Sequence, residues 1–181
     1  MFRVIPELQF SPWISWVNNI QYDTQSAVLG WQSRFRWIDR RDTGLATVTR
    51  SPDFHGPGRG AGNSINALLD AHRLTAEPRY LEKAEALIAR CVHPDDDPNQ
   101  FDLLDAENRW SYTVFLQALG KYLEHRADRG LFDAQYEYAR AVLLKYAMWM
   151  SANERPYLDT PERLEFPTET WAAQDIRKAA V

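Results

Sequence analysis

This sequence of 181 residues has only one cysteine, and it has no long apolar run and no basic tract. Its single cysteine, Cys91, excludes an internal disulfide and a cysteine-rich zinc site, and it favours a reducing compartment such as the cytoplasm while leaving the location open. No apolar run reaches the roughly 20 residues of a membrane span, and Arg3, Pro6 and Glu7 stand where a signal peptide would have its apolar core. We therefore expect no membrane partner.

The charges of the chain are mixed rather than grouped. There are 21 basic and 25 acidic residues, a formal net charge of −4, and the two signs alternate without the basic tract of a duplex-binding surface. No two histidines have the spacing of a helical metal site. We therefore expect no nucleic-acid partner, no metal and no other cofactor.

Aromatic and apolar residues, by contrast, are plentiful, at 13% and 45% of the chain, which is enough for a real core. Around Trp31 and Trp37, apolar and polar residues alternate as in a half-buried strand, and turn-forming residues follow at 40–44. A β-hairpin over about 28–50 is the prediction. Residues 1–55 are thus interpreted as a tryptophan-rich extended segment with this hairpin.

From Gly56 onward the apolar period becomes helical, and residues 56–181 are interpreted as one domain of repeated αα-hairpins. The fold class predicted is therefore mainly α. Five helices are expected: one that follows Gly62 and ends before Pro78, one that carries Tyr80 to Cys91, one over about 106–126, one over about 131–151, and one from Thr168 to the end.

The third hairpin shows its first helix without a returning partner. We expect the sequence either to belong to a longer chain or to complete itself by pairing with another copy, a homo-oligomer that covers the unfinished helical edge.

The glycine-rich segment 58–62 lacks both the G-x-G-x-x-G pattern and the G-K-[ST] ending of a phosphate-binding loop. A close backbone approach at the entry to a helix is the better interpretation of these glycines.

Two segments suggest a family. Residues 62–75 end in Leu74-Thr75, and the next helix starts with Tyr80-Leu81 and then Ala84; this arrangement resembles a hairpin of the α/α-toroid proteins. That superfamily contains six-hairpin glycosidases, polysaccharide lyases and N-acylglucosamine-2-epimerase-like enzymes. Residues 166–175 are similar to the mouth of a later inner helix in the same group. The resemblance covers 56–181 and implies part of an (α/α)6 toroid.

The resemblance also implies where a ligand would bind, because toroid proteins hold ligands at the mouths of their inner helices. Tryptophans beside carboxylates and amides suit sugars, since the ring stacks on C–H faces and the polar groups satisfy hydroxyls. Carbohydrate is therefore the expected partner. The implied catalytic candidates are His55, Glu169 and Asp175, and the implied substrate-binding candidates are Arg59, Asn63, Glu107, Asn108, Trp110, Tyr112, Trp171 and Gln174.

Plainer interpretations exist for the two acids. Glu169 and Asp175 diverge on a regular helix, so a glycosidase pair would need Glu107 or Asp105 from another hairpin. Glu169 also suits the start of a helix capped by Thr168, because an acid there stabilises the helix dipole. Asp175 is followed by two basic residues that favour a solvated face.

Among the four histidines, one is a chemical candidate and three have structural interpretations. Enzymes of the resembled superfamily use histidine to move a proton, which makes His55 the chemical candidate. The pattern places His72 near an apolar face as a hydrogen-bonded core residue, His93 in a turn, and His125 near a helix end where a cation is favourable.

Two functions follow from this sequence. The first is a carbohydrate-active domain that binds or processes a polysaccharide, with hydrolase, lyase and epimerase unresolved. The alternative is a non-catalytic helical-hairpin module for protein interaction or dimerisation. Convergence of Trp110, Tyr112 and Trp171 with Glu169 in an open cleft would favour sugar, whereas burial of all three between layers would favour a scaffold.

Overall fold

The computed structural model describes residues 56–181, and this part of the chain is helical with no strand in it. The mainly α prediction is confirmed there, while the β-hairpin predicted over 28–50 lies outside the described residues. The helices are α3 (Arg59–Thr75), α4 (Pro78–Cys91), α5 (Ala106–Arg109), α6 (Tyr112–Ala127), α7 (Ala134–Asn153) and α8 (Thr170–Ala179), with 3₁₀ turns η2 (Pro98–Phe101), η3 (Tyr157–Asp159) and η4 (Pro161–Arg163).

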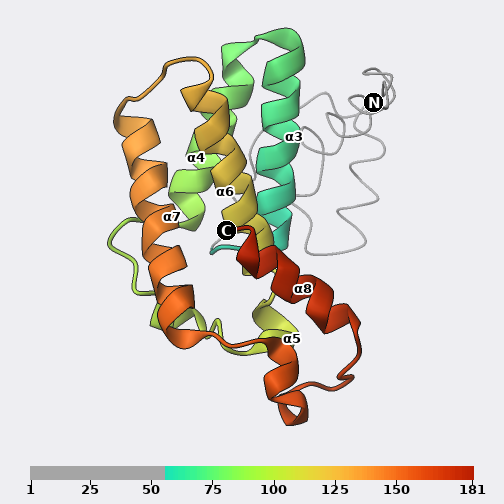
Figure 1. Ribbon diagram of the computed structural model, residues 1–181. Helices are drawn as coiled ribbons and strands as arrows, with labels where there is room; N and C mark the ends of the chain where they lie inside the picture. Colours follow the sequence, from blue (N-terminus) through green and yellow to red (C-terminus); the bar gives the residue numbers. More distant parts are fainter. Residues whose placement is uncertain (1–55) are drawn as a thin grey trace, which may run out of the picture.

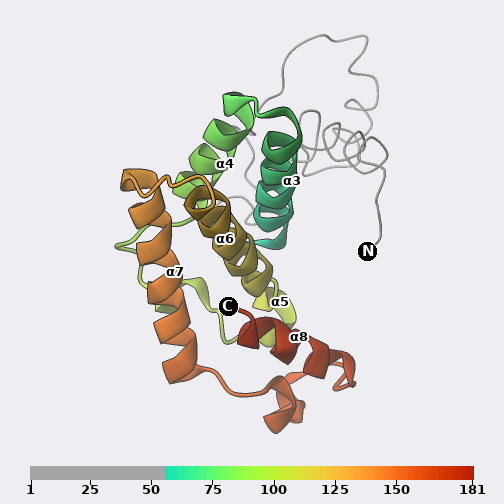
Figure 2. The ribbon, with the colours of Figure 1, turned by 45° about the horizontal axis from the view of Figure 1, so that its top comes forward.

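The long helices α3, α4, α6 and α7 form the main body, and α8 lies across one end of it (Figure 1). Helix α6 is central, because it packs against α3, α7 and α8. Figure 2 shows the same order from a second direction, with α6 between α3 and α7. Within 56–181 no helix is both long and apolar enough to cross a bilayer.

The turn between α3 and α4 follows directly from its residues. Ala76 adopts a left-handed φ of 56° and its N–H donates to the carbonyl of His72, which closes the helix. The Thr75 hydroxyl donates to the carbonyl of Ala71 at 2.8 Å and accepts the N–H of Glu77 at 3.2 Å. Pro78 then opens α4 at a position where no N–H is needed. The helix break predicted before Pro78 is confirmed.

Gly62 sets how closely α3 and α6 approach. A Cβ at this position would lie 2.9 Å from both the Cα of Phe115 and the carbonyl oxygen of Val114. Any other residue would push the two helices apart. The close backbone approach predicted for the glycine-rich segment is confirmed at Gly62.

Apolar side chains from all four long helices fill the core of the main body. Arg126 forms two buried ion pairs at the end of the main body where α3 meets α4. Its guanidinium pairs with Glu85 of α4 and with Asp133, which precedes α7. The largest side chains that are fully buried are Tyr112, Tyr122, Tyr146, Phe115, Ile65, Leu68, Leu69, Leu87, Leu116, Leu119 and His125.

A second, much smaller apolar cluster lies beside α8. We call it the C-terminal cluster, and it consists of the buried Tyr157, Leu164 and Trp171 with Ala106 and Trp110 packed against them. This cluster joins α5, the two short turns that follow α7, and α8. It positions the candidate site described below.

Two predicted boundaries are corrected. The helix expected over 106–126 is two helices, because Asp105 caps α5 through the N–H of Asn108 and the chain bends at Trp110 before α6 begins. The last helix begins at Thr170 rather than Thr168, and Glu169 occupies its N-cap position without a side-chain hydrogen bond. Thr168 is therefore not the N-cap.

Candidate functional site

A pocket of about 250 Å³ lies between α5 and α8, and we call it the tryptophan pocket. Its lining comes from two separate hairpins of the predicted repeat. Four of the predicted substrate-binding residues meet in it. The lining residues are Glu107, Trp110, Phe166, Thr168, Thr170, Trp171 and Gln174.

The two tryptophans play different parts in the pocket. Trp171 is a fixed wall: it is only 9% exposed, its Nε1–H donates to the carbonyl of Phe166 at 3.1 Å, and the ring of Tyr157 meets it edge-on at 5.1 Å. Trp110 is half-buried, and the guanidinium of Arg177 lies over its ring, 5.8 Å from the ring centre. Because Trp110 is the less buried of the two rings, we expect a ligand to stack on Trp110, while Trp171 holds the shape of the pocket.

The polar groups of the tryptophan pocket are an acid, an amide and the hydroxyls of Thr168 and Thr170, which are hydrogen-bonded to each other. One carboxylate oxygen of Glu107 accepts the N–H of Glu165 at 2.7 Å, which fixes that side chain. The amide oxygen of Gln174 is buried and has no hydrogen-bond partner within residues 56–181. A buried acceptor without a donor is costly, so a hydroxyl or N–H brought by a ligand would be stabilised beside it.

Asp175 belongs to a separate ion cluster rather than to the tryptophan pocket. Its carboxylate accepts the backbone N–H of Tyr157 and pairs with the Lys178 ammonium at 3.3 Å. Lys178 also pairs with Glu154 at 3.0 Å, donates to the carbonyl of Arg155 at 3.0 Å, and lies 3.3 Å from the centre of the Tyr157 ring. These contacts attach α8 to the end of α7, so Asp175 faces an internal partner instead of a fully solvated surface.

Tyr112 lies in the core of the main body rather than in the pocket. It is almost fully buried, and its hydroxyl donates to Glu154. Burial first, and then the neighbouring Glu154, raise the pKa of Tyr112 above its ordinary value. The phenol is therefore neutral and committed to Glu154, and it is not available to a ligand in the tryptophan pocket. The convergence of Trp110, Tyr112 and Trp171 with Glu169 in one cleft is therefore not formed, because neither Tyr112 nor Glu169 lines the pocket.

The remaining predicted residues lie apart from this pocket. Glu169 is exposed at the start of α8, and Asn108 is exposed and donates to Asp105 at 2.7 Å. Arg59 is exposed and Asn63 half-buried in the first turns of α3, and neither lines the tryptophan pocket. His55 lies outside the described residues. The three proposed catalytic residues are therefore not brought together within 56–181.

Two histidines that are far apart in sequence form a buried pair. Nδ1 of His72 lies 2.7 Å from Nε2 of His125, and the Arg129 guanidinium lies 3.1 Å from Nδ1 of His125. Because arginine only donates, His125 carries its proton on Nε2 and donates it to His72. The core role predicted for His72 is confirmed.

The electrostatics of His125 correct its predicted role. Burial, and secondarily Arg129, lower the pKa of His125 to about 4, and burial also lowers the pKa of His72. His125 is neutral at pH 7, so the expectation of a cation at this helix end is wrong. His93, in contrast, lies in the predicted turn, where its Nδ1 accepts the N–H of Asp95 at 3.1 Å.

Residues 56–181 contain no group of three or more histidine, cysteine or acidic side chains that could hold a metal ion. No protein-family model, no curated protein and no solved structure matches the chain.

The structure adds residues that sequence reasoning missed. Phe166, Thr168 and Thr170 line the tryptophan pocket, and their place directly before Trp171 was the available signal. Glu154 and Lys178 carried no comparable signal, because their pairing depends on how the loop after α7 folds back.

Proposed function

We propose that the chain binds carbohydrate in the tryptophan pocket. The observation that carries this proposal is that Glu107, Trp110, Trp171 and Gln174, from two hairpins, line one pocket. An aromatic ring beside a carboxylate and an amide is the combination that sugars require, because a sugar offers apolar C–H faces and hydroxyls together.

The dimensions favour a single sugar ring. At about 250 Å³ the pocket is smaller than the 300–1,000 Å³ of ordinary small-molecule sites. A terminal or branching residue of a glycan fits such a volume, with the rest of the glycan in solvent. Stacking on Trp110 and a hydrogen bond to the amide oxygen of Gln174 would orient the ring.

The pocket supports binding better than hydrolysis. A glycosidase needs two carboxyl groups about 5–9.5 Å apart across the scissile bond. In residues 56–181 the lining brings one carboxylate, Glu107, and that group already accepts the N–H of Glu165. Asp175 is engaged by Lys178 and Tyr157. The proposed function is therefore glycan binding.

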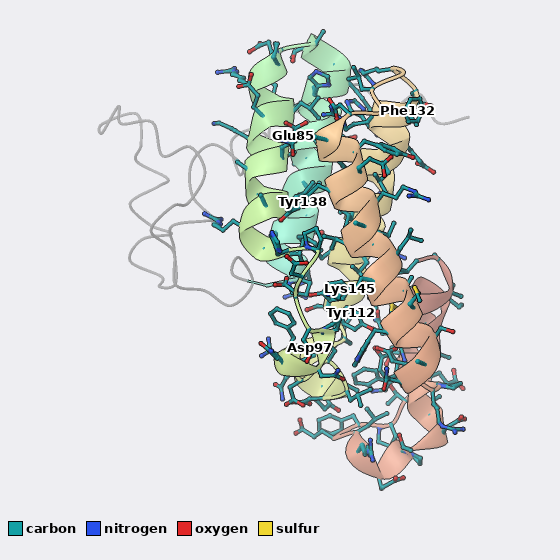
Figure 3. The ribbon with its side chains drawn as sticks, turned by 90° about the vertical axis from the view of Figure 1, so that its left-hand side faces the viewer. Glu85, Asp97, Tyr112, Phe132, Tyr138 and Lys145 are labelled. Atoms are coloured by element: carbon teal, nitrogen blue, oxygen red, sulfur yellow. The ribbon has the colours of Figure 1, made fainter. Side chains whose placement is uncertain are left out.

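The test is a glycan-array screen of the whole chain over neutral and uronic-acid glycans, with Trp110→Ala beside the wild type. We expect selective binding that Trp110→Ala weakens at least about tenfold, as for a central aromatic contact. Phe132→Ala is the control, since it truncates an aromatic side chain that is exposed and lies at the opposite end of the molecule from α8 (Figure 3).

Circular dichroism checks that each variant is folded. A folded wild type that binds no glycan, or a Trp110→Ala variant that binds as well as the wild type, would overturn the proposal.

A further inference from the structure

A second cavity, of about 310 Å³, lies where α7 leads into η3 and η4, and we call it the arginine cavity. This part of the chain is at the bottom of Figure 1. No residue lines both the arginine cavity and the tryptophan pocket. The volume lies within the range of roughly 300–1,000 Å³ that is usual for small-molecule sites.

Three cationic side chains line the arginine cavity, and each comes from a different element. Arg155 follows the end of α7, Arg163 ends η4, and Lys178 belongs to α8. The folded chain brings these charges together from separate positions in the sequence. Within residues 56–181 the lining of the cavity contains one acid, Glu154. Cations are therefore in excess in this cavity.

Lys178 is already paired with acids, whereas the two arginines are not. The Lys178 ammonium pairs with Glu154 at 3.0 Å and with Asp175 at 3.3 Å. The side chains of Arg155 and Arg163 form no ion pair and no hydrogen bond within residues 56–181. Even with both acids counted, the two arginines leave a net positive charge. A hollow lined by one sign of charge attracts ligands of the opposite sign.

The chemistry of arginine narrows the ligand to an oxyanion. A guanidinium group presents its N–H donors in a rigid planar fork that matches two oxygens of a carboxylate or a phosphate. It is also less strongly hydrated than an ammonium group, so it exchanges water for such a ligand more readily. Arg155 and Arg163 are both exposed, which leaves them accessible to a ligand that enters from solvent.

The remaining wall of the arginine cavity favours a ligand with an apolar body. Leu103, Tyr157 and Leu164 line the cavity and are all buried. The Tyr157 hydroxyl is buried without a hydrogen-bond partner within residues 56–181. Burial first, and then Glu154 and Asp175, raise the pKa of Tyr157, so the phenol keeps its proton. A ligand oxygen that reached this hydroxyl would satisfy a donor whose isolation is costly.

We propose that the arginine cavity binds a small organic oxyanion. Arg155 and Arg163 bind its carboxylate or phosphate group, and its apolar body packs against Leu103 and Leu164. This inference does not rest on glycan binding, because the two sites share no residue. The charged residue in the lining of the tryptophan pocket is an acid, Glu107, so the two sites take ligands of different charge.

Isothermal titration calorimetry of the whole chain tests the proposal with three probes that share one ring. The probes are benzoate, phenyl phosphate and the neutral benzyl alcohol. We expect saturable binding of at least one anion with a dissociation constant of about 1 mM or lower, and binding of benzyl alcohol at least about tenfold weaker. Which of the two anions binds more tightly distinguishes a carboxylate ligand from a phosphate ligand.

The position of the anion is tested by removing one arginine at a time. Arg155→Gln and Arg163→Gln should each weaken binding at least about tenfold, because each removes charged hydrogen-bond donors. Arg140→Gln on α7 and Arg177→Gln on α8 are the matched controls, since both residues are exposed arginines outside the cavity. They should leave the dissociation constant unchanged. Circular dichroism checks that each variant is folded.

Three results would overturn the proposal. The first is a folded wild type that binds neither anion, and the second is benzyl alcohol binding as tightly as the anions. The third is binding that survives both Arg155→Gln and Arg163→Gln. Binding lost in Arg177→Gln instead would place the anion beside Trp110, over which Arg177 lies, and would also count against the arginine cavity.

Discussion

The main body and the C-terminal cluster are held together by different means. The main body packs four long helices together through apolar side chains, and Gly62 lies against the backbone of Phe115. The C-terminal cluster buries only Tyr157, Leu164 and Trp171, and α8 depends in addition on the ion pairs of Lys178. Stability and the candidate site therefore reside in different parts of the molecule. The main body provides most of the buried core, and the less firmly packed C-terminal cluster with α8 forms the pocket.

The strongest test of this contrast is Phe115→Ala in the main body. Phe115 is fully buried where α3 and α6 meet, so the truncation leaves a cavity in the centre of the core. We expect a loss of about 3–5 kcal/mol in the free energy of unfolding. Denaturant unfolding followed by circular dichroism measures it. Leu164→Ala in the C-terminal cluster is the comparison, and an equal loss there would contradict the division into two regions.

The second effect in size is a pH dependence carried by the main body. The folded pKa of His125 is about 4, below its ordinary value of 6.5, so the unfolded chain binds the proton more tightly. Neutral His125 contributes fully to the free energy of unfolding above about pH 6.5. This contribution is lost as the pH falls towards 4, and the total loss is about 3 kcal/mol. Chemical denaturation at several pH values measures this slope. His125→Gln should flatten it.

The third prediction compares the stability effects of alanine at two glycines. Gly62→Ala places a methyl group 2.9 Å from the backbone of α6, and we expect a loss of about 1–3 kcal/mol. Gly120→Ala, inside α6 with nothing within 4 Å, should instead raise stability by up to about 1 kcal/mol. Thermal unfolding of the two variants measures both signs. A stabilised Gly62→Ala variant would show that α3 and α6 can separate at no cost.

The smallest global effect is expected from Lys178→Met. Removing the ammonium leaves Glu154 and Asp175 without their cation, and α8 can relieve this by leaving the surface as a local unit. The melting temperature of the main body should change little, while glycan binding in the tryptophan pocket should be lost because α8 carries Trp171. Calorimetry measures the melting temperature and the glycan array measures binding, both on one preparation of the variant. Unchanged binding would contradict the dependence of the pocket on α8.

Sequence patterns predicted the main body better than they predicted the site. Helical periodicity marked α3 and α4 and the core place of His72, because these depend on neighbours three and four residues apart. The break between α5 and α6 at Trp110 was not predicted, because it depends on the cap at Asp105 and not on helical periodicity.

For the site, the tryptophans and Gln174 were found through residue type and their place before helices. The burial of Tyr112 and the bond from the N–H of Tyr157 to Asp175 were not predictable in this way. Both depend on how the chain after α7 folds back, which brings together residues far apart in the sequence. The ion pair of Asp175 with Lys178, three residues further on, is a local contact within α8.

Tyr112 belongs to both regions, since its ring lies in the core of the main body while its hydroxyl is bound to Glu154 at the edge of the ion cluster. We expect such a shared residue to couple the two parts by a small free energy, too small to move the melting temperature of the main body much, and the coupling acts equally in both directions. A double-mutant cycle of Tyr112→Phe with Lys178→Met measures this coupling as the departure of the two changes from additivity. Through one phenol, a ligand held at the end of the molecule would alter the stability of helices that it never touches.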